Sequence, residues 1–124
     1  MCFDTTKHQK PKIATEDIIC WKVIKSNGNA YHQNWHYKIG DTQPRVKIRK
    51  VNHSEEYTSI NEGYDSYINE GYHSYTNIEK AKRYRCWRSY IVGRFIIPKG
   101  TRYFHNKEEG EYVAEVIQRI PYKK

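Results

Sequence analysis

The chain has 124 residues and no leucine, and this absence constrains its fold more than any other feature. Its apolar volume must come from isoleucine, valine and a large aromatic set of 12 tyrosines, 3 tryptophans and 3 phenylalanines. β-Branched and aromatic side chains pack well on a pleated surface, so this composition favours strands. A chain of this length buries roughly two-thirds of its unfolded surface, which suffices for one domain without a metal or disulfide. We therefore expect a folded, β-rich domain despite a mean hydropathy of -1.01.

Two apolar runs predict strands at residues 17–25 and 90–97, and the first ends in Asn27-Gly28, a strong hairpin signal. A return strand is expected at 34–39, and Pro44 to Val51 alternates as a strand with one cationic face. Residues 112–120 fit either a helix or a strand, and Pro121 together with the β-forming residues favours the strand.

A capping-box pattern at Thr76 and Glu79 predicts a short helix over about 77–87. The expected fold class is therefore α+β, a small β-rich antiparallel or mixed sheet of about five strands with one short helix. Residues 1–12 are polar and are expected to be a flexible N-terminus, followed by a single globular domain at 13–124.

An eight-residue unit occurs twice, as INEGYDSY at 60–67 and INEGYHSY at 68–75, differing only at Asp65 and His73. Two copies are too few for a solenoid, which needs about three. The pattern favours a duplicated loop at 60–75, with a paired β-ribbon as the alternative. Either Gly63 or Gly71 can hold the positive-φ position of a turn.

Charge is strongly segregated along the chain, which carries a net charge of +8. Residues 80–107 hold nine Lys or Arg and no acid, whereas residues 54–79 hold six acids and no base. Either the acidic stretch folds over the basic block, or the block and its aromatic residues form an anionic-ligand surface. The candidate ligand-binding residues are Arg83, Arg85, Trp87, Arg88, Arg94, Arg102, Tyr103, Tyr72 and His73.

Few residues match a catalytic or metal-binding pattern. His32 and His36 lack the glutamate of a zinc helix, and we expect neither a metal nor a cofactor. The weak catalytic candidates are Glu109, Glu111 and His73, the first two forming an E-x-E pair.

The three cysteines have no C-x-x-C spacing, and the sequence shows no apolar leader and no apolar run of membrane length. We therefore expect a cytoplasmic protein with no membrane partner.

Several segments together resemble a known group of sequences. These are residues 13–23, 70–75, 96–103 and 110–113, and they resemble small uncharacterised proteins of Bacteroides-type gut bacteria and their phages. That resemblance implies that the repeat copy with His73 is the original one. A more distant likeness, through Ile97-Pro98-Lys99-Gly100-Thr101 and the later E-x-E, is to ADP-ribosyltransferase folds. The likeness implies a catalytic role for Glu109 or Glu111 and places Tyr72 and His73 near a nucleotide, but the first strand has no arginine.

Binding fits these features better than catalysis. We expect a non-catalytic module, an accessory protein of a phage or mobile element, that engages nucleic acid, a nucleotide signal or the acidic face of a host protein, as an inhibitor in the last case. The alternatives are an ADP-ribosyltransferase-like enzyme and a structural or virion component. The sequence does not specify an oligomeric state.

Overall fold

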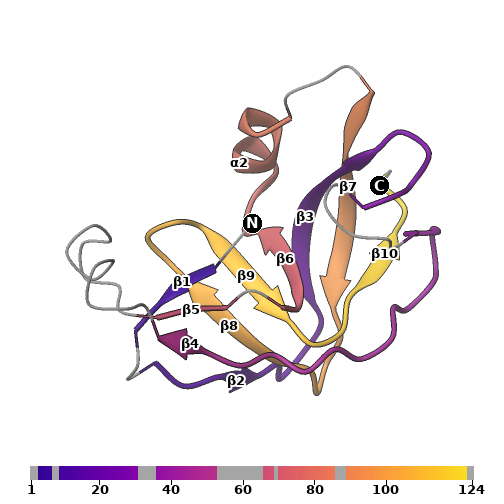
Figure 1. Ribbon diagram of the computed structural model, residues 1–124. Coiled ribbons are helices and arrows are strands. Elements are labelled where there is room, and N and C mark those ends of the chain that lie inside the picture. The colour runs from indigo at the N-terminus through magenta and orange to yellow at the C-terminus, as the bar shows by residue number, and fades with distance from the viewer. Residues whose placement is uncertain are drawn as a thin grey trace.

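The computed structural model describes residues 3–6, 9–30, 36–52, 66–68, 70–85 and 89–122. The larger of two sheets has seven strands, every neighbouring pair antiparallel (Figure 1). In spatial order these are β10 (Gln118–Ile120), β7 (Tyr90–Ile97), β3 (Ile18–Lys25), β6 (Tyr72–Tyr75), β9 (Glu111–Ala114), β8 (Arg102–Asn106) and β2 (Lys12–Ile13). The smaller sheet is also antiparallel and contains β1 (Phe3–Thr5), β5 (Ser66–Ile68) and β4 (Val51–Asn52). The expectation of a β-rich fold is confirmed, but the estimate of about five strands is too low.

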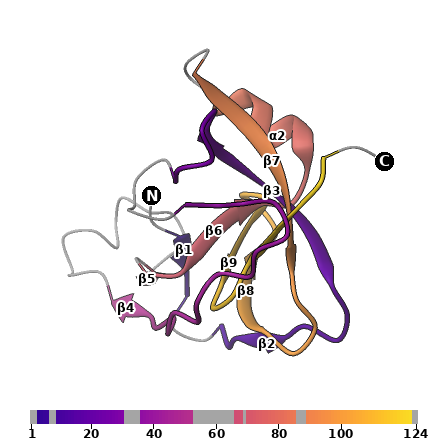
Figure 2. The ribbon, with the colours of Figure 1, turned by 90° about the vertical axis from the view of Figure 1, so that its right-hand side faces the viewer.

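A long two-stranded ribbon gives the larger sheet its shape. β3 and β7 pair along eight residues, from Ile18 opposite Ile97 to Lys25 opposite Tyr90. Beyond a bend the same two chain segments pair again as β2 and β8, and the Ala14 amide donates to the Thr101 carbonyl at 2.9 Å between them. β6 and β9 connect the two halves of the ribbon by pairing with β3 and β8. The sheet therefore curls, with one inner and one outer face (Figure 2).

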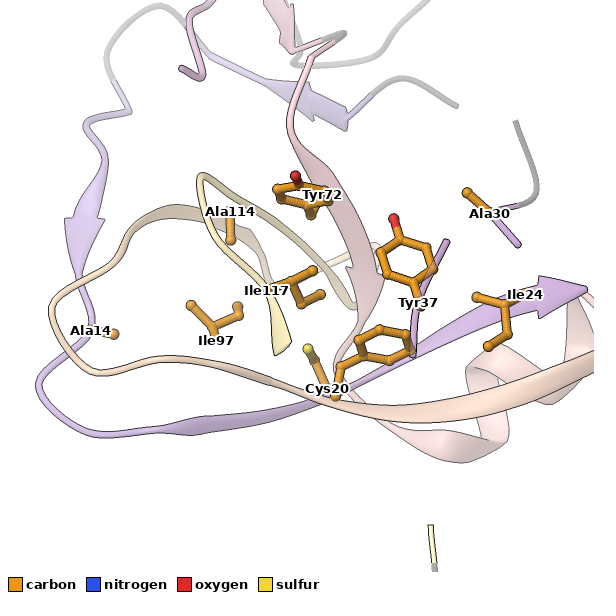
Figure 3. Packing of buried hydrophobic residues seen from close by; sticks show 10 residues of the cluster. Ala14, Cys20, Ile24, Ala30, Tyr37, Tyr72, Ile97, Ala114 and Ile117 are labelled. Carbon is orange, nitrogen blue, oxygen red and sulfur yellow. The ribbon is translucent and has the colours of Figure 1, made fainter. Parts of the chain in front are cut away.

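The main hydrophobic core lies on the inner face. Tyr37 and Phe95 pack edge to face there, with ring centroids 5.1 Å apart, and Tyr72 lies beside them (Figure 3). The Tyr72 hydroxyl donates to the Pro44 carbonyl at 2.7 Å, which satisfies a polar group that would otherwise be costly to bury. Aromatic rings and isoleucines thus fill the volume that leucine would occupy, as the composition predicts.

The outer face is covered by two separate structures. The smaller sheet packs over β8 and β9 through a second cluster of Phe3, Ile48, Ile68, Phe104 and Val113. The helix α2 (Ile78–Arg83) contacts β3, β6 and β7. Phe3 is fully buried, so the structure places residues 3–5 of the expected flexible N-terminus in the core instead. Burial of Phe3 and the pairing of β1 with β5 together hold this short strand against the domain.

The helix is shorter than the predicted 77–87 and begins at a different cap. Asn77, not Thr76, is the N-cap, and its side chain accepts a hydrogen bond from the Lys80 amide at 2.8 Å. Asparagine is a better N-cap than threonine, which explains the shift by one residue. The helix ends at Arg83 with Tyr84 as its C-cap, and residues 86–88 lie outside the described part of the chain.

The predicted turn at Asn27-Gly28 is confirmed, because Gly28 has φ of +92° and the chain returns through a bridge between Ile24 and Ala30. The predicted return strand at 34–39 is not confirmed. Residues 34 and 35 lie outside the described residues, and in 36–39 the one β-contact is an isolated bridge between His36 and Asn29. The C-terminal run is extended as predicted, although it divides into β9 and β10.

Residues 43–50 are extended but belong to neither sheet. Only every third amide pairs with the neighbouring chain: Gln43 N donates to the Ile117 carbonyl at 2.9 Å and Val46 N to the Glu115 carbonyl at 2.8 Å. Pro44 has no amide hydrogen to donate, which interrupts a ladder at its start. The predicted strand is therefore wrong, but the predicted alternation holds, since Ile48 is buried whereas Arg45 and Lys47 are exposed.

The two repeat copies occupy different places in the fold. In the second copy Gly71 has φ of +108° and leads into β6. In the first copy residues 60–65, with Gly63, lie outside the described residues, and Ser66 and Tyr67 belong to β5 of the smaller sheet. Among the described residues of the two copies, those of the second therefore supply a strand to the larger sheet.

Candidate anionic-ligand site

A row of side chains crosses the outer face of the larger sheet. Ile120 on β10 lies opposite Arg94 on β7, which lies opposite Trp21 on β3. Trp21 lies in turn opposite Tyr75 on β6. Directly opposed residues in antiparallel strands project from the same face, so these four side chains are neighbours although the sequence separates them widely. α2 contacts three of the four strands that carry this row, namely β7, β3 and β6.

A pocket of about 310 Å³ opens where α2, β7 and the C-terminal segment meet. The described residues that line it are Lys82, Arg85, Val92 and Tyr122. The Tyr122 ring lies edge to face against Trp21, with centroids 5.6 Å apart, so the pocket is continuous with the outer-face row. Two cations and an aromatic ring around a concave surface can bind an anionic group together with an apolar or aromatic one.

The positive charge of this region is not neutralised by any described acid. The ion pairs among the described residues are those of Glu115 with Arg45 and with Arg102, so Lys82, Arg85 and Arg94 have no carboxylate partner there. The Arg94 guanidinium lies over the Trp21 ring, 6.0 Å from its centroid. Of the acidic stretch, residues 54–65 lie outside the described residues, so whether it covers the basic block stays a prediction.

The sequence-predicted ligand residues divide between several parts of the fold. Arg85 lines the pocket, Arg94 lies in the adjoining row, and Arg83 is exposed at the end of α2. Trp87 and Arg88 lie outside the described residues. Tyr72 and His73 are consecutive on a strand and so project from opposite faces, which means they cannot line one site together.

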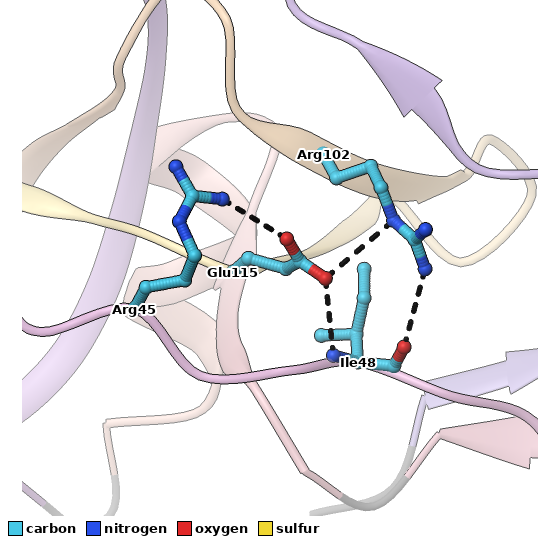
Figure 4. A network of polar contacts seen from close by, with 4 residues as sticks. All are labelled: Arg45, Ile48, Arg102 and Glu115. Carbon is cyan, nitrogen blue, oxygen red and sulfur yellow. Dashed lines mark hydrogen bonds and ion pairs between the residues drawn. The ribbon is translucent and has the colours of Figure 1, made fainter.

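Arg102 and Tyr103 are also placed away from the pocket. Arg102 forms an ion pair with Glu115 at 3.5 Å, and Arg45 donates to the same carboxylate at 3.0 Å (Figure 4). The Glu115 carboxylate is nearly buried and also faces the Ile48 amide at 3.4 Å, so this network holds the 43–50 segment to β8. Tyr103 packs against the inner core and lies edge to face with Tyr112. Both residues therefore make contacts within the fold, away from the pocket.

Glu111 of the E-x-E pair continues the outer-face row beyond Tyr75. Glu111 opens β9 opposite Tyr75, and Lys80 on the helix approaches the intervening Gly110. Burial and the neighbouring Glu109 raise the pKa of the Glu111 carboxyl to about 7. Two strand spacings of roughly 4.8 Å separate Glu111 from Trp21. Glu111 is also not among the described residues that line the pocket.

We expect Glu111→Gln to stabilise the protein at pH 8 and to leave its stability unchanged at pH 4. In the folded state the raised pKa keeps the acid protonated up to pH 7, whereas the unfolded chain releases its proton near pH 4.5. Stability therefore falls as pH rises through this window. Because the carboxyl is only half-buried and partly screened, the gain is about 1 kcal/mol. Urea unfolding at both pH values measures it, and an equal effect at pH 4 and 8 would contradict this assignment.

A partly buried lysine, Lys22, lies on the inner face. Lys22 on β3 directs its ammonium at the His73 carbonyl and lies over the Tyr37 ring, 5.5 Å from its centroid. Burial of the ammonium lowers the pKa of Lys22 to about 8, and burial of the adjacent Cys20 thiol raises its pKa to about 12. A protonated thiol is a poor nucleophile, so Cys20 is a packing residue, as its sequence context predicts.

Comparison with known proteins leaves the family open. No family model matches the chain, and no curated protein and no solved structure is detectably similar to it. Within the described ranges no helix has the length and apolar character needed to cross a membrane. In the same ranges no three His, Cys, Asp or Glu side chains are grouped as metal ligands, and His36 instead contacts the Asn29 side chain at 2.8 Å. Any function must therefore be argued from the site itself.

Sequence reasoning missed Trp21 and Tyr122, the two rings that join the pocket to the sheet face. They are a hundred residues apart in the chain, and only the pairing of β3 with β7 and of β7 with β10 brings them together. Both residues lie outside the basic block at 80–107, so the charge pattern did not indicate them as ligand-binding residues. An exposed tyrosine beside the C-terminal lysines was the one available signal.

Proposed function

We propose that the protein is a non-catalytic binding module that engages an anionic ligand at the pocket between α2, β7 and the C-terminal segment. The observation that carries this proposal is the pair of cations Lys82 and Arg85 in a pocket whose wall includes Tyr122. Among the described residues neither cation has an ionic partner. Unpaired cations at a concave surface attract anions because less competing charge must be displaced.

The two cations have complementary properties. Arg85 offers a planar fork of donors suited to phosphate or carboxylate oxygens, whereas Lys82 is a compact charge on a flexible stem. Arg94 lies close by in the outer-face row and adds to the positive potential. Its stacking on Trp21 limits the conformations of the guanidinium, which reduces the entropy lost on binding.

The proposal is tested by retention on immobilised heparin as salt is raised. We expect Lys82→Ala/Arg85→Ala to elute at clearly lower salt than the wild type, because two ion contacts and their released counterions are lost. Lys47→Ala/Arg49→Ala is the matched control: it removes the same charge from exposed positions on the 43–50 segment. If both double variants shift elution equally, binding reflects net charge alone and the proposed site is wrong.

A further inference from the structure

Exposed aromatic rings adjoin the cations of the pocket. Tyr122 is 48% exposed although it packs against Trp21, and Tyr84, next in sequence to Arg85, is 50% exposed. The Tyr84 ring is held in place by parallel stacking on the Tyr75 ring, with centroids 5.3 Å apart. Each exposed ring thus rests on a second ring carried by the sheet.

This arrangement prepares the rings for stacking against a ligand. The supporting rings, Trp21 and Tyr75, are opposed on neighbouring strands β3 and β6, so the sheet fixes their spacing. A ring that is already held in place loses little side-chain freedom when a planar group stacks on it. The edge-to-face pairing with Trp21 leaves part of the Tyr122 surface open, as its exposure shows.

We propose that the ligand is single-stranded nucleic acid, with one base stacked on Tyr122 and the neighbouring phosphates held by Lys82 and Arg85. This inference rests on the proposed function and specifies its ligand. Proteins that bind single strands combine a cationic groove with aromatic side chains on which bases stack. A pocket of about 310 Å³ lies at the lower end of the range for ligand sites, so it takes one nucleotide while the strand continues across the surface.

A nucleic-acid duplex and an acidic protein face are the other polyanions to compare with a single strand at this surface. Bases in a duplex are stacked on each other and cannot reach a side-chain ring without being flipped out. An acidic protein face would pair with the two cations and pack side chains on the exposed ring, so the oligonucleotide titrations below distinguish it from a single strand. Sequence-tolerant binding is expected, because stacking uses the ring faces that all bases share.

The test uses the full-length protein and fluorescently labelled 12-residue oligothymidylate and oligouridylate in anisotropy titrations at low and moderate salt. We expect Tyr122→Leu to weaken binding roughly 5- to 150-fold, because one base–ring contact is lost. Tyr122→Phe is the matched control, since it keeps the ring, and it should bind within about twofold of the wild type. Both variants should keep the wild-type retention on heparin, and circular dichroism checks that both are folded.

The outcomes separate the two proposals. Loss of oligonucleotide binding in Tyr122→Leu with heparin retention intact supports single-strand recognition. Heparin binding without oligonucleotide binding, equal affinity for a duplex of the same length, or equal affinity for a free mononucleotide overturns the single-strand inference and leaves the proposed function standing. Failure to bind either heparin or oligonucleotides overturns both.

Discussion

Replacement of Gly71 by alanine is expected to destabilise the protein by about 3 kcal/mol or more. Gly71 has φ of +108°, a conformation that is costly for any residue with a Cβ atom. A Cβ atom here would also lie 2.5 Å from Ile48 Cγ2 and 2.8 Å from Val113 Cγ2, both in the outer core. Because these neighbours belong to a packed cluster and not to flexible side-chain ends, they cannot move aside cheaply.

Gly40→Ala is the control that separates the two causes. Gly40 has φ of +93°, but no atom lies within 4 Å of the position of its Cβ. Its replacement should therefore cost only the backbone term, about 1 to 2 kcal/mol. Chemical denaturation of the three proteins measures the difference. Equal destabilisation by Gly40→Ala and Gly71→Ala would mean that close packing of the turn against Ile48 and Val113 is not important.

The prediction for Gly71 illustrates how far sequence reasoning reaches in this fold. The glycine was one of two candidates for a positive-φ turn, and local sequence identity made the two repeat copies indistinguishable. What distinguishes them is the set of side chains around the turn, and Val113 is more than forty residues away. The strand at 90–97 was predictable to the residue because a run of β-branched and aromatic residues, interrupted only by Gly93 and Arg94 and stopped by Pro98, defines it without reference to any partner.

In segment 43–50 the alternation of side chains could be predicted from the sequence, but membership of a sheet could not. Its alternation correctly predicted that Ile48 faces inward, because burial follows the two-residue period of any extended chain. Whether an extended chain joins a sheet depends on a partner strand with matching free donors and acceptors, which its own residues do not specify. Here the partner is the non-regular stretch around Glu115 and Ile117, and the amides pair only at intervals.

Only part of the candidate site could be predicted from the sequence, because the rest depends on which strands pair. A high local density of Lys and Arg placed Arg85 and Arg94 among the candidate residues, since charge segregation is visible in the sequence. The aromatic half of the site depends on strand register, which places Trp21 opposite Arg94, and on the C-terminal segment, which places Tyr122 against Trp21. Strand register is set by pairing between distant segments, so it cannot be predicted from any short stretch of the sequence.

Replacement of Lys22 by methionine is expected to stabilise the protein by about 2 kcal/mol at pH 7. Burial lowers the pKa of Lys22 from 10.5 to about 8, which is a cost of holding the ammonium charged inside the fold. Methionine has a similar length and no charge, so it removes this cost and loses one hydrogen bond to the His73 carbonyl, worth about 1 kcal/mol. Urea unfolding of both proteins at pH 7 provides the measurement.

The pH dependence identifies the cause of the effect. Between pH 8 and 10.5 the unfolded chain binds a proton at Lys22 that the folded protein has released, so the wild type gains stability relative to Lys22→Met as pH rises. The advantage of methionine should therefore shrink by about 1 kcal/mol between pH 7 and 9. The comparison cancels the titration of Cys20 and the tyrosines, which both proteins share. Lys25→Met, at an exposed position on the same strand, should change little at either pH.

Lys22 faces the inner core whereas the pocket lies on the outer face, so heparin retention of Lys22→Met should equal that of the wild type. A stabilised variant with intact binding would show that this lysine is not required for ligand recognition. A stabilised variant that no longer binds would instead couple the inner face to the ligand surface through β3, the strand that carries both Lys22 and Trp21. A pH-independent loss of stability would contradict the buried-charge account itself.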